Sequence, residues 1–233
     1  MPFYYFYDAR YMAMLIPVLL ITLYAQFKVS STFNRYSRIA NSRHLTGAQA
    51  AAEVLRRHGV YDVRIERVRG NLTDHYDPRT NVIRLSDSVY DSPTIAAVGV
   101  AAHEAGHAVQ YAVGYVPIQI RAAIIPLTQV GSQVGIVLLI LGLILSFESL
   151  FFIGIVLFSF TTLFQLVTLP VEFNASRRAM ETIRSGGLLN DQEANGARKV
   201  LSAAALTYVA ALLMSIVQLL RYVMLFSGRR RND

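Results

Sequence analysis

Two histidines and a glutamate within five residues form the part of this sequence best suited to chemistry. They are His103, Glu104 and His107 in the segment HEAGH. In a helix, residues i and i+4 lie on one face, so both imidazoles can reach the same metal ion. Glu104 projects about 100° further round the helix, beside the ion, where it can take a proton from water. Zinc suits this pattern, because it binds His and carboxylate ligands and keeps one open position in catalytic sites.

The surroundings of the motif strengthen this interpretation. HEAGH lies in an Ala-rich segment that we expect to be a long helix opening at Ser92-Pro93, with Pro93 at its first position. Three ionisable groups in such an apolar helix are costly unless something satisfies them, and a bound cation would. The alternative is two surface histidines with a chance glutamate between them.

The composition indicates a membrane protein. Of 233 residues, 54% are hydrophobic and only 16% are charged, whereas a soluble domain carries roughly 25% charged residues. Uncharged runs of 17, 26, 23 and 21 residues cover 11–27, 122–147, 149–171 and 200–220. A spanning helix needs about 20 apolar residues. We therefore expect four spans, at about 11–27, 127–147, 149–170 and 202–222.

The first run is short, but tyrosines bracket it as an aromatic belt would. These are Tyr4, Tyr5, Tyr7, Tyr11 and Tyr24. No basic segment precedes the run, so we expect a retained anchor rather than a signal peptide. Small residues at four-residue spacing in the second run, Gly131 and Gly135 with Ser132, indicate close helix packing.

The basic residues give an orientation. Residues 28–121 and 172–199 hold 12 and 5 of the 22 Lys and Arg side chains. Four spans put both segments on one side, which the positive-inside rule makes cytoplasmic, with both termini outside. This topology places Arg229, Arg230 and Arg231 outside, against the positive-inside rule. Either the last helix does not span the membrane fully, or the basic tail is tolerated on the outer side. Because the net charge of +7 sits between apolar runs, it does not indicate nucleic acid.

Two histidines need a third ligand, and cysteine is absent. The downstream acidic residues are Glu148, Glu172, Glu181, Asp191, Glu193 and Asp233. The expected topology places the first and last of these across the membrane from the motif. Glu181, Asp191 and Glu193 lie in a polar, loop-like region, so we interpret them as solvated charges rather than as metal ligands. We prefer Glu172, which follows a span on the side of the motif; its alternative role is a cap or an ion pair with Arg177 or Arg178.

The remaining polar part, about 120 residues long, is enough for one small domain. Residues 46–58 predict a helix with Thr46 as N-cap and Gly59 at its end. Residues 60–68 and 82–85 predict two strands of a hairpin, with a turn at Asp77-Pro78. Gly186-Gly187 divides the second polar piece into two short helices.

Several further residues have both a functional and an ordinary interpretation. The strand 82–85 could be an edge beside the metal that pairs with substrate, or a plain hairpin edge. His75 and Tyr76 could donate to an oxyanion, or be solvated. Arg177 and Arg178 could clamp a substrate carboxylate, but a membrane-interface anchor is the simpler role. We expect His44 and His58 at the surface, and Asp74 and Asp77 as turn formers.

Four segments resemble the YugP-type membrane zinc metallopeptidases of bacteria. They are LTDHYDPRTNVIRLSDSVY, VGVAAHEAGHAVQYAVGY, FQLVTLPVEFNASRRA and ARKVLSAAALTYVAA. A more distant similarity is to HtpX-like and CAAX prenyl proteases, with their downstream E-[FY]-x-A-D pattern. Here the last position is Ser176, a weaker partner for a ligand histidine than aspartate. The resemblance implies His103, His107 and Glu172 as zinc ligands and Glu104 as the base.

We accordingly expect a mainly α, multi-pass membrane protein with a small zincin-like α+β domain at the cytoplasmic face, residues 1–233 forming one metallopeptidase domain. The expected function is a Zn²⁺-dependent endopeptidase of the cell membrane that acts on membrane or membrane-proximal proteins. The alternative is a non-catalytic scaffold of a protease assembly with a structural zinc. Expected partners are the lipid bilayer and protein or peptide substrates, without nucleic acid; a homo-oligomer or larger protease assembly stays open. An ion transporter would need ionisable groups within the spans, and the four runs contain none.

Overall fold

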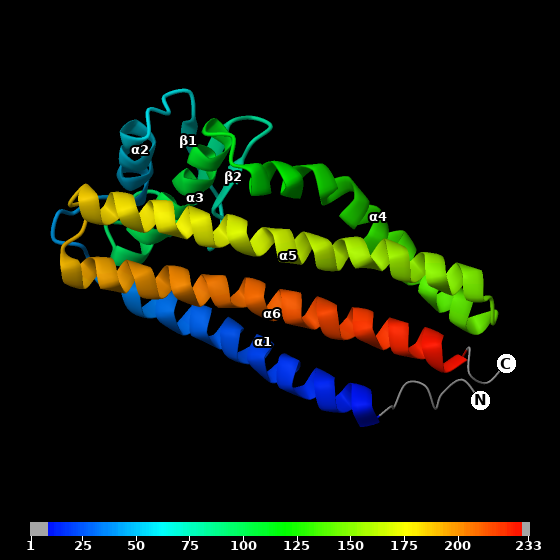
Figure 1. Ribbon diagram of the computed structural model, residues 1–233. Helices are drawn as coiled ribbons and strands as arrows, with labels where there is room; N and C mark the ends of the chain where they lie inside the picture. Colours follow the sequence, from blue (N-terminus) through cyan, green and yellow to red (C-terminus); the bar gives the residue numbers. More distant parts are fainter. Residues whose placement is uncertain (1–8, 230–233) are drawn as a thin grey trace. The chain divides into compact units, whose positions relative to one another are not determined.

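The computed structural model describes residues 9–229, which form six helices and one three-stranded sheet (Figure 1). The helices are α1 (Ala9–Tyr36), α2 (Gly47–Arg57), α3 (Ile95–Ala112), α4 (Val116–Ile144), α5 (Glu148–Ser185) and α6 (Asp191–Arg229). The strands are β1 (Arg64–Val68), β2 (His75–Asp77) and β3 (Val82–Ser86). The expected fold class, mainly helical with a small sheet and four long apolar helices, is confirmed.

The chain divides into two compact units. One, here called the sheet unit, comprises Ala25–Gln119 and Pro170–Leu206; the other, the apolar unit, comprises Met1–Tyr24, Ile120–Leu169 and Thr207–Asp233. Four helices are long and apolar enough to cross a membrane: Tyr11–Tyr36, Val116–Ile144, Glu148–Ser185 and Asp191–Ser227. They are longer than the expected spans, because a helix does not end where its first charged residue occurs. The limits of the spans stay a prediction. Tyr4, Tyr5, Tyr7, Arg230, Arg231 and Asp233 lie outside the described residues.

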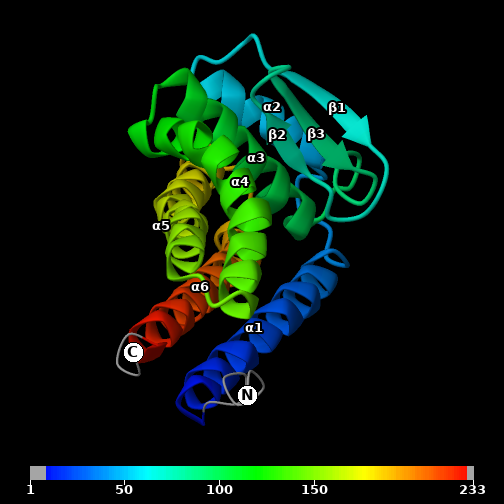
Figure 2. The same cartoon turned by 90° about the vertical axis from the view of Figure 1, so that its right-hand side faces the viewer.

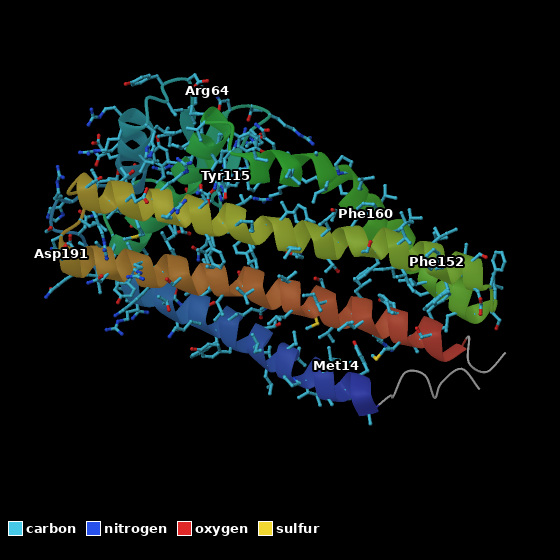
Figure 3. The ribbon with its side chains drawn as sticks, in the orientation of Figure 1. Met14, Arg64, Tyr115, Phe152, Phe160 and Asp191 are labelled. Carbon is cyan, nitrogen blue, oxygen red and sulfur yellow. The ribbon has the colours of Figure 1, made fainter. Side chains whose placement is uncertain are left out.

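Small residues bring α4 and α5 together within the apolar unit. A Cβ atom on Gly131 would collide with the backbone of Leu157, and one on Gly135 would lie 3.2 Å from the Leu157 side chain. This confirms the packing role expected from their spacing. Large apolar side chains such as Phe152, which is 51% exposed, point outward from the unit (Figure 3). Such a surface suits contact with lipid.

The sheet has the order β1-β3-β2, so β3 is its central strand (Figure 2). β1 pairs with β3 in parallel, and β2 pairs with β3 antiparallel. The expected hairpin between 60–68 and 82–85 is therefore wrong. Residues 69–81 are long enough to lead the chain back along the sheet, and they supply β2 as the second edge. The Asp77-Pro78 turn joins β2 to β3, and the strand 82–85 is not an edge.

The helix caps follow from local chemistry. Thr46 and Gln49 form a capping box at the start of α2, and Gly59 adopts a φ of +69° after its end, as expected. α3 starts later than expected, because Thr94 is its N-cap and accepts from the Ala97 amide at 3.3 Å. Pro93 therefore precedes the N-cap and is not the first residue of the helix. Its carbonyl accepts a hydrogen bond from the Asn41 amide at 2.9 Å.

The Gly186-Gly187 pair ends α5, but it separates two long helices rather than two short ones. Gly187 has a φ of +58°, and the Leu188 amide donates back to the Ile183 carbonyl at 3.0 Å. Glu193, expected to be solvated, is buried. Its carboxylate accepts from the amides of Ser42 at 2.6 Å and Asn190 at 3.0 Å, which explains why a charge is tolerated there.

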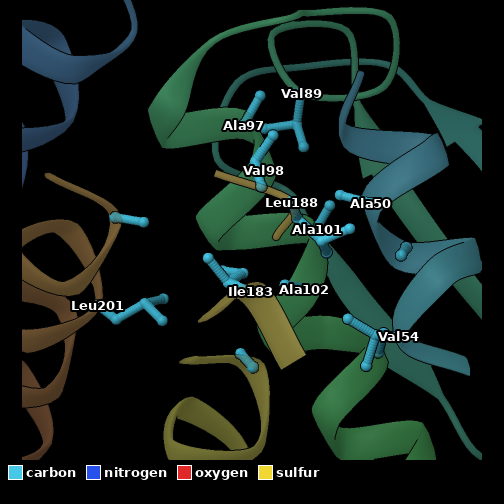
Figure 4. Close-up of a cluster of buried hydrophobic side chains, with 14 of the residues drawn as sticks. Ala50, Val54, Val89, Ala97, Val98, Ala101, Ala102, Ile183, Leu188 and Leu201 are labelled. Carbon is cyan, nitrogen blue, oxygen red and sulfur yellow. The ribbon is translucent and has the colours of Figure 1, made fainter. Parts of the chain in front are cut away.

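The core of the sheet unit forms around α3. Val54, Ala101, Ile183 and Leu201 belong to one buried cluster that joins α2, α3, α5 and α6 (Figure 4). Alanine and glycine on α3 let its neighbours approach closely. The tightest approach is at Gly106, where a Cβ atom would lie 2.6 Å from the Ala175 carbonyl oxygen of α5.

Replacing Gly106 by alanine should therefore destabilise the fold, although alanine is the better helix former. We expect Gly106→Ala to lower the free energy of unfolding by about 1–3 kcal/mol, because the added methyl must push α5 away. Gly99→Ala is the matched control, since its Cβ would meet the Ala197 side chain at a milder 3.3 Å. Denaturant titration of the purified chain measures both. Equal stability of the two variants would show that α5 is not held at Gly106.

Candidate metal centre

Three of the residues singled out in the sequence meet in the sheet unit. His103 and His107 come from α3, and Glu172 comes from α5. The Glu172 Oε2 atom lies 3.2 Å from Nε2 of His103 and 3.5 Å from Nε2 of His107. Their ligand atoms all lie within 4.8 Å of one another, and Glu172 is buried. The i, i+4 spacing thus brings both imidazoles to one carboxylate on another helix.

The glycine inside HEAGH explains how that carboxylate reaches the histidines. Gly106 precedes His107, and Ala175 follows Glu172 by three residues, so this close contact of α3 with α5 lies next to one ligand and one helical turn from another. A side chain at Gly106 would separate the two helices and carry Glu172 away from the imidazoles. Glycine is therefore required here for close approach.

A buried amide fixes the orientation of the His107 ring. The Gln110 Nε2 group donates to the Val171 carbonyl at 2.8 Å and to Asn174 Oδ1 at 3.0 Å. Its Oε1 atom therefore faces His107 Nδ1, 3.0 Å away, and must accept the ring proton there. In the neutral ring this leaves the Nε2 lone pair directed at Glu172. That tautomer is the one a metal ligand needs.

His103 has a similar, weaker support. The Ser176 Oγ atom lies 3.1 Å from His103 Nδ1, so its hydroxyl oxygen can accept the ring proton. The serine thus occupies the place of the aspartate in the E-[FY]-x-A-D pattern and still orients the ring. With both rings held in this way, two nitrogen lone pairs and one carboxylate face a common point.

Such a donor set fits a cation. Lone pairs on Nε2 of His103 and His107 repel the Glu172 carboxylate unless a positive charge lies between them. Burial by itself lowers the pKa of His107, but the carboxylates of Glu172 and Glu104 outweigh it and raise that pKa above its ordinary value. The site therefore attracts positive charge. Two imidazoles and one carboxylate are ligands that zinc prefers.

Glu104 lies beside this group without belonging to it. Its Oε2 atom accepts a hydrogen bond from the backbone amide of Tyr76 at 3.0 Å. Because Tyr76 lies on β2, this bond ties the Glu104 carboxylate to the edge of the sheet. The residue expected to act as a base is thus held in place by an element that the sequence motif does not include.

The side chains of His75 and Tyr76 are occupied by other partners. His75 is exposed, and its Nδ1 atom lies 2.8 Å from the Thr73 carbonyl. The Tyr76 hydroxyl donates to Asn81 Oδ1 at 2.7 Å, and its ring lies against Tyr111. Burial raises the pKa of Tyr76 to about 12, so the phenol keeps its proton. Their role as oxyanion donors stays a prediction.

The other acidic candidates do not reach the metal group. Glu181 and Asp191 are exposed, as expected, and Glu148 is the first residue of α5 in the apolar unit. Asp77 forms the turn predicted for it by accepting from the Arg79 amide at 3.0 Å. Asp74 is half-buried and accepts instead from the Ser86 amide at 2.7 Å.

The remaining candidates lie at a distance from the ligands. His44 is exposed, and His58 is half-buried at the end of α2 with Nδ1 2.9 Å from the Val54 carbonyl. Arg177 is exposed, whereas Arg178 donates from Nε to Asn174 Oδ1 at 2.8 Å. Arg178 therefore supports the amide network around His107. This role differs from both that the sequence suggested, a clamp for a substrate carboxylate and an anchor at the membrane interface.

Gln110 and Asn174 are the site residues that sequence reasoning missed. Gln110 is fully buried and Asn174 nearly so. A signal was present, because Gln110 is a polar residue three positions after His107 in a helix that is otherwise apolar outside the HEAGH motif. Its partner could not be found in the same way, since the contact joins residues 64 positions apart.

The chain resembles known proteins over most of its length. Residues 11–227 match the model of a family described as "Putative neutral zinc metallopeptidase". A relative from Bacillus subtilis (strain 168), named "Putative membrane protease YugP", is 49% identical over 218 residues, which cover 93% of this chain and 97% of that protein. No solved structure matches the chain.

Removing the support of His107 should weaken metal binding. We expect Gln110→Ala to lower the affinity for zinc about 10- to 100-fold, because His107 loses the acceptor that sets its tautomer. Competition with a zinc-binding chromophore measures the affinity. Gln119→Ala, at an exposed position of the same unit, should leave it unchanged. An unaltered affinity in Gln110→Ala would mean that the amide does not orient the ligand.

Proposed function

This chain belongs to the family described as "Putative neutral zinc metallopeptidase", and from that premise we propose that it is a zinc-dependent endopeptidase of the cell membrane. It would hydrolyse peptide bonds of membrane or membrane-proximal proteins. The observation that supports this best is the group of His103, His107 and the buried Glu172, with Glu104 beside it.

The number of ligands favours catalysis over a structural role. Among the residues that the structure describes, His103, His107 and Glu172 form the one group of three or more His, Cys, Asp or Glu side chains able to hold a metal ion. A structural zinc is closed by four protein ligands, whereas a catalytic zinc has three and an open position. A scaffold with a structural zinc would need a fourth ligand. All three side chains come from one chain, so the site requires no second subunit.

The proposed chemistry divides between the metal and Glu104. When bound, zinc supplies a Lewis acid that polarises a carbonyl and makes water acidic enough to lose a proton near neutral pH. The Glu104 carboxylate accepts that proton as the water oxygen forms its bond to the peptide carbon. It then passes the proton to the amine nitrogen as the carbon–nitrogen bond breaks. The Tyr76 amide, bonded to Glu104 Oε2, keeps the carboxylate facing the site during both transfers.

The proposed membrane topology follows from helix length and charge. Four helices are apolar enough to span, and the relative from Bacillus subtilis is named a membrane protease. The excess of Lys and Arg in 28–121 and 172–199 favours a cytoplasmic position for both segments. Since His103, His107 and Glu172 lie in these segments, we place the active site on the cytoplasmic side.

The same arrangement narrows the substrate class. α3, which bears the motif, is not one of the four candidate spans, so cleavage is expected outside the bilayer core. Glu172 follows the uncharged residues 149–171 directly, so juxtamembrane segments of membrane proteins are the nearest substrates. Pairing of substrate with the strand 82–85 is not part of the proposal, because β3 has a neighbour on both sides.

Replacing the base should abolish turnover without removing the metal. We expect Glu104→Gln to lower the rate of peptide hydrolysis by at least about 100-fold, because the amide cannot accept the proton from water. The variant should retain zinc, since Glu104 is not a ligand. Mass spectrometry of peptides released from a membrane-protein extract by the zinc-loaded chain measures hydrolysis without a known substrate. Glu66→Gln, on β1, serves as the matched control. Cleavage by Glu104→Gln at the wild-type rate would refute the mechanism.

A further inference from the structure

A second polar feature of the sheet unit lies apart from the metal ligands. An open cavity of about 840 Å³ lies between α1 and α6, lined by four cations. They are Lys28 and Arg35 on α1 and Arg198 and Lys199 on α6. Hydroxyl groups of Thr32 and Ser202 also line it, and none of the described residues that line it is acidic. Its chemistry is therefore that of an anion site.

Helix periodicity explains why the cations gather there. Lys28, Thr32 and Arg35 recur at intervals of four and three residues, so they lie on one face of α1. On α6, Arg198 and Ser202 are likewise four residues apart. The two faces meet below the cavity, where a Cβ atom on Gly196 would lie 2.7 Å from the Tyr36 ring. This close contact holds positive charges from both helices around one space.

Within residues 9–229, the four positive charges lack counter-ions. In the described part of the chain, none of the four side chains forms an ion pair with a carboxylate. The guanidinium group of Arg35 lies over the ring of Tyr36. The nearest acid in the sequence, Glu193, is occupied by the amides of Ser42 and Asn190. Like charges facing one another repel, so an anion from outside would stabilise this arrangement.

The position of the cavity along the chain indicates where that anion comes from. Lys28 is the first charged residue after the uncharged run 11–27, and Lys199 is the last before the run 200–220. Both walls therefore continue directly into uncharged runs of candidate spans, and we expect the ends of such runs at the level of lipid headgroups. All four cations are exposed, and Ala203 and Leu206 add apolar surface to the lining. A headgroup phosphate could bind the cations while its acyl chains follow the apolar helices.

From these observations we propose that the cavity between α1 and α6 binds the phosphate of an anionic phospholipid headgroup. Cationic side chains and hydroxyl donors recognise phosphate oxygens, and basic sites at the ends of spans favour anionic lipids. An acidic peptide is a poorer occupant, because a soluble segment would gain nothing from walls that continue into apolar spans. The proposal concerns membrane binding and does not depend on the peptidase activity.

The test uses the full chain in a neutral detergent, titrated with phosphatidylglycerol or phosphatidylcholine of identical acyl chains. Native mass spectrometry counts the bound lipids. We expect phosphatidylglycerol to bind at least about tenfold more tightly, and Arg198→Gln/Lys199→Gln to weaken it about 10- to 30-fold, since each cation near anionic lipid contributes to the attraction. Lys28→Gln/Arg35→Gln, on the facing wall, should do the same.

Arg69→Gln/Arg79→Gln is the matched control, because it removes two exposed cations that do not line the cavity. It should leave lipid affinity unchanged. Unaltered zinc content and thermal midpoint show that each variant is folded, and the two cavity variants test the same site independently. Equal binding of the two lipids by the wild type, or a preference that survives in both cavity variants, would overturn the proposal. So would displacement of the lipid by millimolar glycerol phosphate or by a polyglutamate peptide, which would identify a site for soluble anions.

Discussion

The approach of α5 to α3 at Gly106 is the contact on which the rest of the site depends. It places the Glu172 carboxylate opposite two imidazoles that helix geometry alone had already set on one face. It also brings Val171 and Asn174 within reach of Gln110, which orients His107, and it brings Ser176 within reach of the His103 ring. Gly106 permits this contact because it has no side chain. The chemistry of the motif therefore depends on the close packing of α3 against α5 as much as on the ligands themselves.

Three such ligands in an apolar core are costly unless their polar atoms have partners. The structure provides separate partners for the outer ring nitrogens and for Glu104. Gln110 and Ser176 satisfy the outer ring nitrogens, the Tyr76 amide holds Glu104, and the inner lone pairs are left for a cation. A buried polar network is stable only when each member has a partner. This explains why so many buried polar groups surround HEAGH in an otherwise Ala-rich core.

Much of this could be predicted from the sequence, for reasons that differ by residue. His103, Glu104 and His107 follow from helix period, and Glu172 from its place after an uncharged run, because both signals are local. The order of the sheet was predicted wrongly, since β1 and β3 looked like a hairpin and the three residues of β2 are too few to show an alternating pattern. Glu193 was misjudged because its partner Ser42 is 151 positions away. Long-range pairing of polar groups leaves little trace in a single sequence.

The claim that α3 and α5 together hold one zinc ion is tested most directly by the metal content of the purified chain, measured by elemental analysis. The wild type and Glu181→Ala, a control at an exposed position of the same helix, should each contain about one zinc per chain. Glu172→Ala should lose it, because two imidazoles alone bind zinc too weakly to survive purification. Zinc retained in Glu172→Ala would move the third ligand to another residue, and zinc absent from the wild type would contradict the metal centre altogether.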